Sequence, residues 1–227
     1  MKNWSELQTE FWNKGYAVID ELIPVELARA WGKTALTRAS DFPLKEGVKY
    51  IQKKFEVADD QTRDAAGVYN LVSIDGFASM AFFDGLGTWY DALTPFLSLF
   101  TGLDVVTSED VKSAVTVMAY PPPAGQMLAH YDTNALTMLL YFTDNEDGGT
   151  EVLPLTSRRP TTLGKEDEIT GPTEIVLPRV GRAVIMQGRR VWHRAMPVAG
   201  KTKVSSAWNY YVKGDFWRPE GVSKRLY

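Results

Sequence analysis

The sequence predicts a mainly β fold of the α+β class, in which N-terminal helices are followed by a barrel or double-sheet jelly roll. The chain has 227 residues, 44% of them hydrophobic, which suits one large domain or a core with an N-terminal extension. Helical spacings of apolar residues occur before residue 110, whereas short strand patterns follow one another after it. We therefore expect one domain with a helical and mixed region over 1–109, a jelly-roll core over 110–213 and a tail over 214–227.

The first elements expected are a helix and a short strand. Asn3 or Ser5 can cap a helix over Glu6–Asn13, because both side chains accept hydrogen bonds from free backbone N–H groups. Gly15 ends this helix, since glycine readily adopts the left-handed conformation of a helix C-terminus. The next residues, 16–19, form a short apolar run that predicts a buried strand.

Two further helices are expected in the N-terminal half. Pro24 opens one that runs to about Arg38, since proline fits the first turn of a helix. Its apolar stripe consists of Leu27, Ala30, Trp31 and Ala35. The other spans 88–100, and Pro95 can kink or split it. The region between these helices is expected to hold strands over 50–57 and 69–74 and a polar loop over 59–66.

After residue 110 the sequence alternates between strand patterns and turn signals. Strands are expected over 113–120, 135–143, 150–153, 173–177, 183–186 and 204–212. Turn-forming residues separate them at 121–125, 144–149 and 178–181. The acidic run from Asp144 to Asp147 is expected to be a solvated turn. The stretch from Pro154 to Thr173 holds little apolar material, and so long a loop is usually functional or mobile.

Composition excludes several classes of function. The net charge is −3 and basic residues form no run longer than a pair, which disfavours a nucleic-acid-binding face. The absence of cysteine excludes disulfides, cysteine-ligated zinc and thiol nucleophiles. The N-terminus lacks the apolar segment of a signal peptide, and no window holds the roughly 18 apolar residues that span a bilayer. We expect a cytoplasmic protein without a membrane or nucleic-acid partner, as a monomer or a homodimer.

Two histidines and one aspartate form a candidate metal site. His130 and Asp132 lie two residues apart, so an extended backbone would point both side chains to one side. His193 is the only other histidine, and the buried strand and turn before it can bring it to the same end of a barrel. Two imidazoles and a carboxylate suit a non-haem ferrous ion and leave positions open for other ligands.

Other interpretations of these residues stay open at this point. The His-x-Asp pattern is short and occurs by chance, and a lone histidine is often a hydrogen-bonded structural residue. The same three side chains also suit a zinc ion, which would indicate a hydrolase.

The surroundings of these residues follow a longer pattern. A tyrosine on a strand precedes His-x-Asp; an apolar strand, a Gly-Gly pair, a second histidine, a basic residue and a serine follow. The residues of this pattern are Tyr120, His130, Asp132, Tyr141-Phe142-Thr143, Gly148-Gly149-Thr150, His193, Lys203 and Ser205. In their order and spacing they resemble the iron(II)- and 2-oxoglutarate-dependent dioxygenases, on the prolyl-4-hydroxylase-like or phytanoyl-CoA-hydroxylase-like branch. The resemblance covers 114–211 closely, and 11–19 also looks like this family.

The resemblance implies a double-stranded β-helix, which is a cupin-like jelly roll, and a set of cofactors. His130, Asp132 and His193 would bind Fe(II), with 2-oxoglutarate as co-substrate, O2 as oxidant and ascorbate as a stimulant. Lys203 would bind the distal carboxylate of 2-oxoglutarate, with Ser205 beside it.

Other residues are assigned to the 2-oxoglutarate pocket by the same resemblance. Tyr120 and Tyr141 would line it, and Lys201 is the second choice for the cation. An exposed strand lysine and ordinary aromatic packing are the plain alternatives for these side chains.

The implied reaction is hydroxylation of an unactivated C–H bond, coupled to oxidative decarboxylation of 2-oxoglutarate. The halogenases of this superfamily replace the carboxylate ligand with a small residue, so Asp132 disfavours halogenation. Desaturation, cyclisation, peptidyl hydroxylation and a catalytically silent metal or 2-oxoglutarate sensor stay open. A compact chain without a peptide-docking module favours a small amino-acid-like or natural-product substrate.

Substrate contacts are expected near the mouth of the barrel. The candidates are Gln126, Asn134, Trp192 and Arg194, together with the loop over 155–172 that carries Arg158 and Arg159. The basic side chains can pair with a carboxylate of the substrate, or they can be solvated surface charges.

Overall fold

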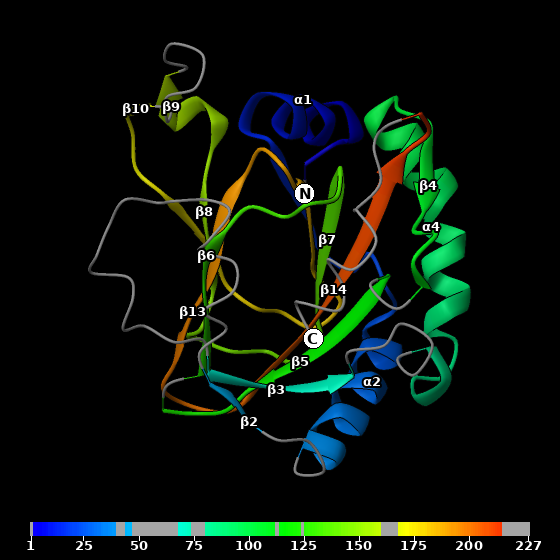
Figure 1. Cartoon of the computed structure of the whole chain (residues 1–227), viewed down its shortest axis with the longest axis vertical. Coiled ribbons are helices and arrows are strands. Elements are labelled where there is room, and N and C mark those ends of the chain that lie inside the picture. The colour runs from blue at the N-terminus through cyan, green and yellow to red at the C-terminus, as the bar shows by residue number, and fades with distance from the viewer. Residues whose placement is uncertain are drawn as a thin grey trace.

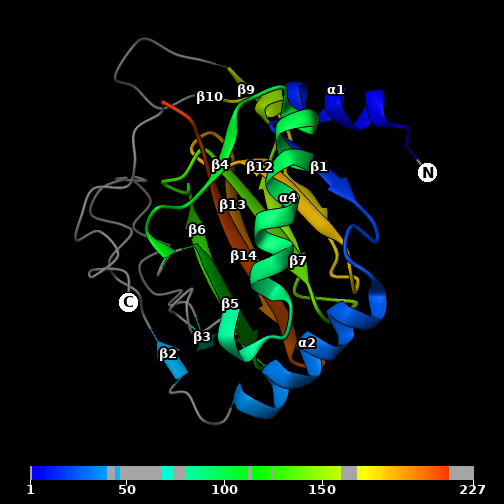
Figure 2. The same cartoon turned by 90° about the vertical axis from the view of Figure 1, so that its right-hand side faces the viewer.

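The computed structural model describes residues 2–39, 44–46, 68–73, 80–111, 114–123, 125–159 and 168–214. In this part of the chain two antiparallel sheets face each other, and helices cover the outer side of the larger sheet (Figures 1 and 2). The helices are α1 (Trp4–Lys14), α2 (Val25–Arg38) and α4 (Leu86–Thr101), and the short 3-10 helix η5 spans Leu155–Ser157. The fold class expected from the sequence is therefore confirmed.

The strands form one hydrogen-bonded order that folds back on itself. The larger sheet has the spatial order β1 (Tyr16–Ile19), β12 (Ala183–Gln187), β7 (Leu136–Tyr141), β14 (Lys203–Val212), β5 (Val115–Tyr120) and β3 (Val68–Ser73). Beside it, β2 (Leu44–Glu46) pairs with β3, and β4 (Val105–Thr107) pairs with β14. The smaller sheet has the order β6 (Gly125–His130), β13 (Trp192–Val198), β8 (Thr150–Leu153) and β11 (Glu174–Val176). A separate pair consists of β9 (Arg158–Arg159) and β10 (Glu168–Ile169). Val68 of β3 lies opposite Gln126 of β6, so the two sheets are joined along one side.

The first helix begins and ends on the signals that the sequence carries. Asn3 accepts a hydrogen bond from the backbone of Glu6, and the Glu6 side chain accepts one from the backbone of Asn3, which is a complete capping box. Gly15 ends the helix with φ of 84°, a conformation that costs a side chain with a Cβ atom. The chain then enters β1 directly, as expected.

The second helix buries most of the stripe that its apolar residues predict. Trp31 and Ala35 are buried and Leu27 packs against the core, whereas Ala30 is exposed. Gly32 is also buried, and a Cβ atom there would lie only 2.5 Å from the backbone oxygen of Phe142. This close approach of the helix to the larger sheet, for which the sequence carries no signal, adds Gly32 to the contact face.

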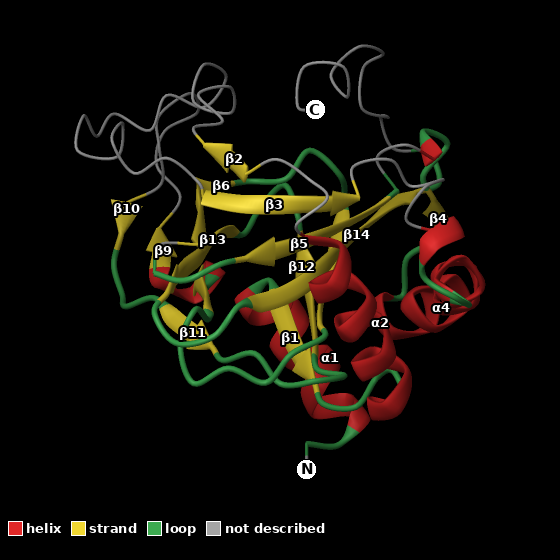
Figure 3. Ribbon diagram, turned by 90° about the horizontal axis from the view of Figure 1, so that it is seen from below, coloured by secondary structure: helices red, strands yellow, loops and turns green. Residues whose placement is uncertain are grey.

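Alternation along the central strand β14 separates the two sides of the larger sheet. Val204, Trp208 and Tyr210 pack in the core beneath the helices, whereas Lys203 and Ser205 point to the other face, toward the smaller sheet. Figure 3 shows this layering, with the helices on one side of the larger sheet and the smaller sheet on the other. The inner face therefore lines the space in which the sequence places its site.

Most expected strands are present, and the differences concern the smaller sheet. The stretches expected around 69–74, 113–120, 135–143, 150–153, 173–177, 183–186 and 204–212 form β3, β5, β7, β8, β11, β12 and β14. The strand patterns in the sequence do not predict β6 and β13. The long stretch from Pro154 to Thr173 contains η5, β9 and β10 in its described part. The expectations over 50–57 and 59–66 lie outside the described residues.

The helix α4 continues through Pro95 as one element, so Pro95 does not split it. None of the helices in the described ranges combines the length and apolarity that crossing a membrane requires.

Candidate metal centre

The smaller sheet and the turn after β6 bring the three candidate ligands together. His130 is the last residue of β6, and His193 lies directly opposite it on β13. Their ring centroids are 4.4 Å apart. Asp132 follows β6, and its backbone N–H donates to the carbonyl of Gly188 over 3.0 Å. Asp132 thus lies two residues beyond the last residue of the strand.

The ligand atoms of the three residues are close enough to hold one ion. His130 Nε2 lies 3.4 Å from Asp132 Oδ1, and His193 Nε2 lies 3.7 Å from Asp132 Oδ2. One ligand atom from each residue can be chosen so that all lie within 4.8 Å of one another. Neighbouring ligands of an ion that binds nitrogen and oxygen at about 2 Å need separations of this order. The geometry therefore fits a metal ion.

His193 is held in the form that binds metals. Its Nδ1 lies 3.1 Å from the carbonyl oxygen of Val191. A carbonyl only accepts hydrogen bonds, so Nδ1 must carry the proton and donate. Burial lowers the pKa of His193 to about 4; His130 adds to this effect and Asp132 opposes it. Near neutral pH the ring is thus uncharged, with the lone pair of Nε2 directed at Asp132.

Asp132 remains a carboxylate although only 17% of its side chain is exposed. Burial acts to raise its pKa, but the imidazoles of His193 and His130 and the hydroxyl of Thr137 hold that pKa well below its ordinary value. A carboxylate oxygen and the lone pair of an imidazole nitrogen both attract a cation that lies between them. The donor set of two imidazoles and one carboxylate therefore fits a divalent metal ion by its chemistry as well as its spacing.

Lys203 is buried at the start of β14 with its positive end inside the fold. Only 1% of the residue is exposed. Its Nζ donates to the carbonyl of Gly148 over 2.7 Å and lies 4.1 Å from the ring centroid of Tyr120. Within the described part of the chain no carboxylate lies at ion-pair distance from it. Burial lowers the pKa of Lys203 to about 7, and the charge of Asp147 opposes this shift. Lys201, the second choice, is exposed.

The other expected pocket residues share the inner face with Lys203. Tyr120 lies opposite Lys203 on β5, and Tyr141 lies opposite Ser205 on β7. The Tyr141 hydroxyl donates to Thr150 Oγ1 over 2.6 Å, and burial raises the pKa of Tyr141 to about 12. The tyrosines are packed and partnered in the way that core aromatics are, yet each lies beside a polar residue of the same face.

The acidic run after β7 is a turn in which Asp144 and Glu146 are exposed, as expected, and two of its carboxylates also accept backbone hydrogen bonds. Asp144 accepts a hydrogen bond from the backbone of Val180. Asp147 accepts two, from the backbone of Ala199 and Gly200. These bonds fix the loop whose next residue, Gly148, presents its carbonyl to Lys203.

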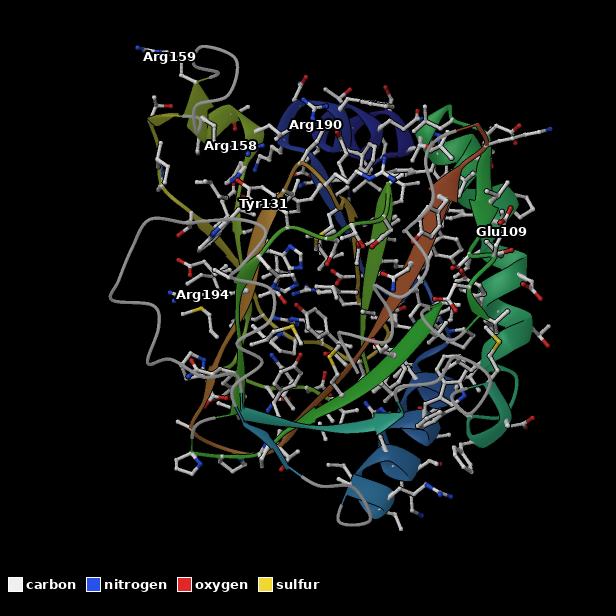
Figure 4. The ribbon with its side chains drawn as sticks, viewed as in Figure 1. Glu109, Tyr131, Arg158, Arg159, Arg190 and Arg194 are labelled. Carbon is white, nitrogen blue, oxygen red and sulfur yellow. The ribbon has the colours of Figure 1, made fainter. Side chains whose placement is uncertain are left out.

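The expected substrate contacts are less well placed than the metal ligands. Trp192 and Arg194 flank His193 in β13, so their side chains lie on the opposite face of the strand. Arg194 Nε is paired with Glu151 Oε2, on the outer side of the smaller sheet (Figure 4). Asn134 is fully buried. Gln126 lies half-buried where β6 meets β3.

Arginines from the long loop lie near the metal-binding end of the barrel. Arg158 Nη1 donates to the hydroxyl of Tyr131, the residue between His130 and Asp132, over 3.1 Å. Its Nη2 donates to the carbonyl of Arg190. Figure 4 shows Tyr131, Arg158 and Arg190 at the same end of the molecule, whereas Arg159 points away.

The sequence does not predict the roles of several residues that shape the site. Thr137, Gly188 and the carbonyl of Val191 orient the ligands through hydrogen bonds and close packing. Thr137 lies between buried apolar residues in β7, and a threonine inside an apolar strand is too common to signal a role. The other two act through the backbone, for which the sequence carries no signal.

The fold has close counterparts among solved structures, although no protein-family model and no curated protein sequence matches the chain. AviO1 from Streptomyces viridochromogenes Tue57 superposes with a TM-score of 0.68 at 16% identity, over 96% of this chain and 99% of its own. The non-heme alpha ketoglutarate dependent epimerase SnoN from nogalamycin biosynthesis gives 0.67 at 13% identity, over 98% and 86%. A Pseudomonas putida prolyl-4-hydroxylase gives 0.57 at 16% identity, over 91% and 98%. The chain has the fold of the iron and 2-oxoglutarate-dependent oxygenases.

The double-stranded β-helix fold agrees with the resemblance seen in the sequence. SnoN has been solved in complex with Fe3+, alpha ketoglutarate and nogalamycin RO, which shows that this fold holds a metal, a co-substrate and a small molecule together in that protein.

Proposed function

We propose that the chain is an Fe(II)- and 2-oxoglutarate-dependent oxygenase that oxidises an unactivated C–H bond of a small molecule. The observation that carries the proposal is the pairing of two features on the inner faces of the barrel. One is the cluster of His130, Asp132 and His193, with ligand atoms within 4.8 Å. The other is Lys203, a buried cation without a carboxylate at ion-pair distance among the described residues.

The three residues would hold the ion through two imidazoles and one carboxylate. A donor set of this kind leaves coordination positions for a chelating co-substrate and O2. A ferrous ion bound in this way, with 2-oxoglutarate and O2, supplies the oxidising chemistry: 2-oxoglutarate, O2 and R–H become succinate, CO2 and R–OH. The protein residues orient the reactants and exclude water.

Lys203 would bind the distal carboxylate of 2-oxoglutarate. A buried ammonium group is costly unless it is paired, and a dicarboxylate that chelates the metal at one end supplies the missing partner at the other. Ser205, two residues along the same face, would add a hydroxyl donor. The polar side chains between the two ends include Thr150, which lies opposite Ala195, and Tyr141, to which Thr150 is hydrogen-bonded.

Hydroxylation is the proposed outcome, and Asp132 opposes halogenation by occupying the place that a chloride would need. The solved neighbours include a prolyl-4-hydroxylase, the epimerase SnoN and the carbocyclase SnoK, so the product itself has to be measured. Mass spectrometry distinguishes hydroxylation, which adds an oxygen atom, from desaturation or cyclisation, which removes two hydrogen atoms, and from epimerisation, which changes neither.

The test is succinate formation by purified protein with Fe(II), ascorbate and 2-oxoglutarate, first alone and then with a panel of small molecules and peptides. We expect slow uncoupled succinate formation that a small-molecule substrate stimulates, and loss of it in His130→Ala, Asp132→Ala and His193→Ala. Succinate formation that survives His193→Ala would contradict the metal assignment. Activity with Zn(II) in place of Fe(II) would indicate a hydrolase, and binding of iron and 2-oxoglutarate without O2 consumption would indicate a sensor.

A further inference from the structure

We infer that Thr137 is a positioning residue that turns the Asp132 carboxylate toward the metal, and that Asn134 fixes the direction of its hydroxyl. The inference rests on the proposed function, because it concerns how the chain presents a ligand to the ion. Thr137 lies on β7 and is buried. Its Oγ1 is 2.5 Å from Asp132 Oδ2 and 2.8 Å from Asn134 Nδ2.

The direction of this hydrogen-bond chain follows from the chemistry of its members. The amide nitrogen of Asn134 only donates, so Thr137 Oγ1 must accept from it. The single proton of the hydroxyl is then left for Asp132 Oδ2. The amide cannot be turned over, because Asn134 Nδ2 also donates to the carbonyl of Leu136.

Asn134 adopts this orientation although part of it is unsatisfied. Its Oδ1 is buried and has no hydrogen-bond partner. An unsatisfied buried acceptor is costly, so the amide is kept in place by the bonds of its Nδ2. A residue expected to touch the substrate is therefore placed to orient a metal ligand instead.

The consequence for the metal is that Asp132 offers one oxygen and not two. Oδ2 receives the proton of Thr137, whereas Oδ1, which lies 3.4 Å from His130 Nε2, is presented beside the first imidazole. A ligand oxygen fixed in this way needs no rotation on binding, and partners of metal ligands commonly contribute 10–100-fold in metal affinity.

Gly188 supports the same arrangement through close packing. A Cβ atom there would lie 2.7 Å from the backbone oxygen of Asn134, 2.9 Å from Thr137 Oγ1 and 3.1 Å from Asp132 Cβ. The Gly188 carbonyl also accepts the backbone N–H of Asp132. The turn can therefore approach Asp132 and Thr137 only because this position has no side chain.

The test is an anaerobic titration of metal-free protein with Co(II), followed by its visible absorption, in the absence of 2-oxoglutarate. Thr137→Val keeps the shape of the side chain and removes the hydroxyl. We expect its Kd for Co(II) to rise by about 10- to 100-fold, with a changed absorption band because the carboxylate is free to coordinate through both oxygens. Thr137→Ser keeps the hydroxyl and should restore both the Kd and the spectrum.

The matched control is Thr101→Val in α4, far from the site in the chain and in the fold. Thr101 is also buried, and its hydroxyl also accepts one hydrogen bond, from Leu103, and donates one, to Leu97. We expect this variant to bind Co(II) like the wild type. Equal Kd values for Thr137→Val and the wild type would overturn the inference.

Failure of this inference and failure of the proposed function give different results. A wild-type chain that binds neither Co(II) nor Fe(II) refutes the metal site itself, whereas a wild type that binds and an unaffected Thr137→Val refutes the positioning role alone. Thr137→Ala is the second variant in case valine disturbs the packing. If neither variant folds while Thr101→Val does, the hydroxyl serves folding and the inference is overturned.

Discussion

His193 would be stabilised by a bound cation and Lys203 by a bound anion. The lone pair of the neutral His193 ring faces the Asp132 carboxylate, whose nearer oxygen lies 3.7 Å from Nε2, and a cation bound by both residues would be attracted to each. Lys203 is a buried potential cation whose hydrogen bond is to a neutral carbonyl, and an anion would stabilise its charged form. A metal ion chelated by a dicarboxylate satisfies both requirements at once.

The shifted pKa of Lys203 predicts how stability depends on pH. The unfolded chain holds this proton up to its ordinary pKa of 10.5, whereas the folded chain holds it only below about 7. Between these pH values folding must release the proton, and at lower pH folding must bury the charged group. Lys203 therefore makes the ligand-free protein less stable as the pH falls from 10.5 toward 7. Lys203→Met should raise the Tm of the metal-free protein, most strongly at and below neutral pH, and the gap should shrink toward pH 10.5.

Thermal unfolding over a pH series checks this prediction, with Lys213→Met as the control because Lys213 is exposed. A gap between Lys203→Met and the wild type that is the same at every pH would contradict it. The same variant should also lose the stabilisation that 2-oxoglutarate gives the metal-loaded wild type, because it lacks the proposed partner of the distal carboxylate.

At the scale of the elements, the strands that carry the metal ligands were the hardest to predict. The central strands β7 and β12 are buried on both faces and appear in the sequence as continuous apolar runs. The strands β6 and β13 mix polar, charged and apolar residues, and β13 also contains Pro197 where its pairing with β6 is irregular. The ligands themselves were predictable from motif spacing, which does not require the strand to be recognised.

The contacts that orient the metal ligands could not be predicted from the sequence. They join residues that are distant in sequence, such as Gly188 and Asp132, or they use backbone carbonyls. A pattern along one chain does not encode such contacts, because they depend on how the strands pack.

Two helical glycines, Gly32 in α2 and Gly87 in α4, are expected to respond differently to alanine. In Gly32→Ala the new Cβ would meet the rigid backbone oxygen of Phe142 at 2.5 Å, so the helix must move and the free energy of unfolding should fall by about 1–3 kcal/mol. In Gly87→Ala, in α4, it would meet only the flexible Met80 side chain at 3.2 Å or more, and the higher helix propensity of alanine should offset this. Urea denaturation of both variants is the measurement, and equal effects would contradict the proposed packing.

At the scale of the whole molecule, side chains bridge the two ends of the strand order. β1 and β11 are the terminal strands of that order. Glu174 of β11 accepts hydrogen bonds from Lys14, at 2.7 and 2.8 Å, and from the hydroxyl of Tyr16 on β1, at 2.7 Å. β1 and β11 are not paired through their backbones, but side-chain hydrogen bonds join them. We call the cluster of Lys14, Tyr16 and Glu174 the seam.

The seam predicts a local change in stability with a defined pH dependence. Burial acts to raise the pKa of Glu174, but the hydrogen bonds from Lys14 and Tyr16 outweigh it and place the pKa below its ordinary value of 4.5. A carboxyl group of this kind stabilises the fold above 4.5, and its contribution disappears as the pH falls through the lower folded value. Because 41% of the Glu174 side chain is exposed, solvent screening keeps the effect on the whole fold small.

Glu174→Ala should therefore speed amide hydrogen exchange in β1 and β11 while β14 stays protected, because only the terminal strands lose a connection. Its loss of stability relative to the wild type should shrink as the pH is lowered below 4.5. Lys213→Ala is the control, since Lys213 pairs with Asp104 over 3.7 Å with both side chains largely exposed and should have no measurable effect. Unchanged exchange in β1 and β11 of Glu174→Ala would show that packing alone keeps these two edges together.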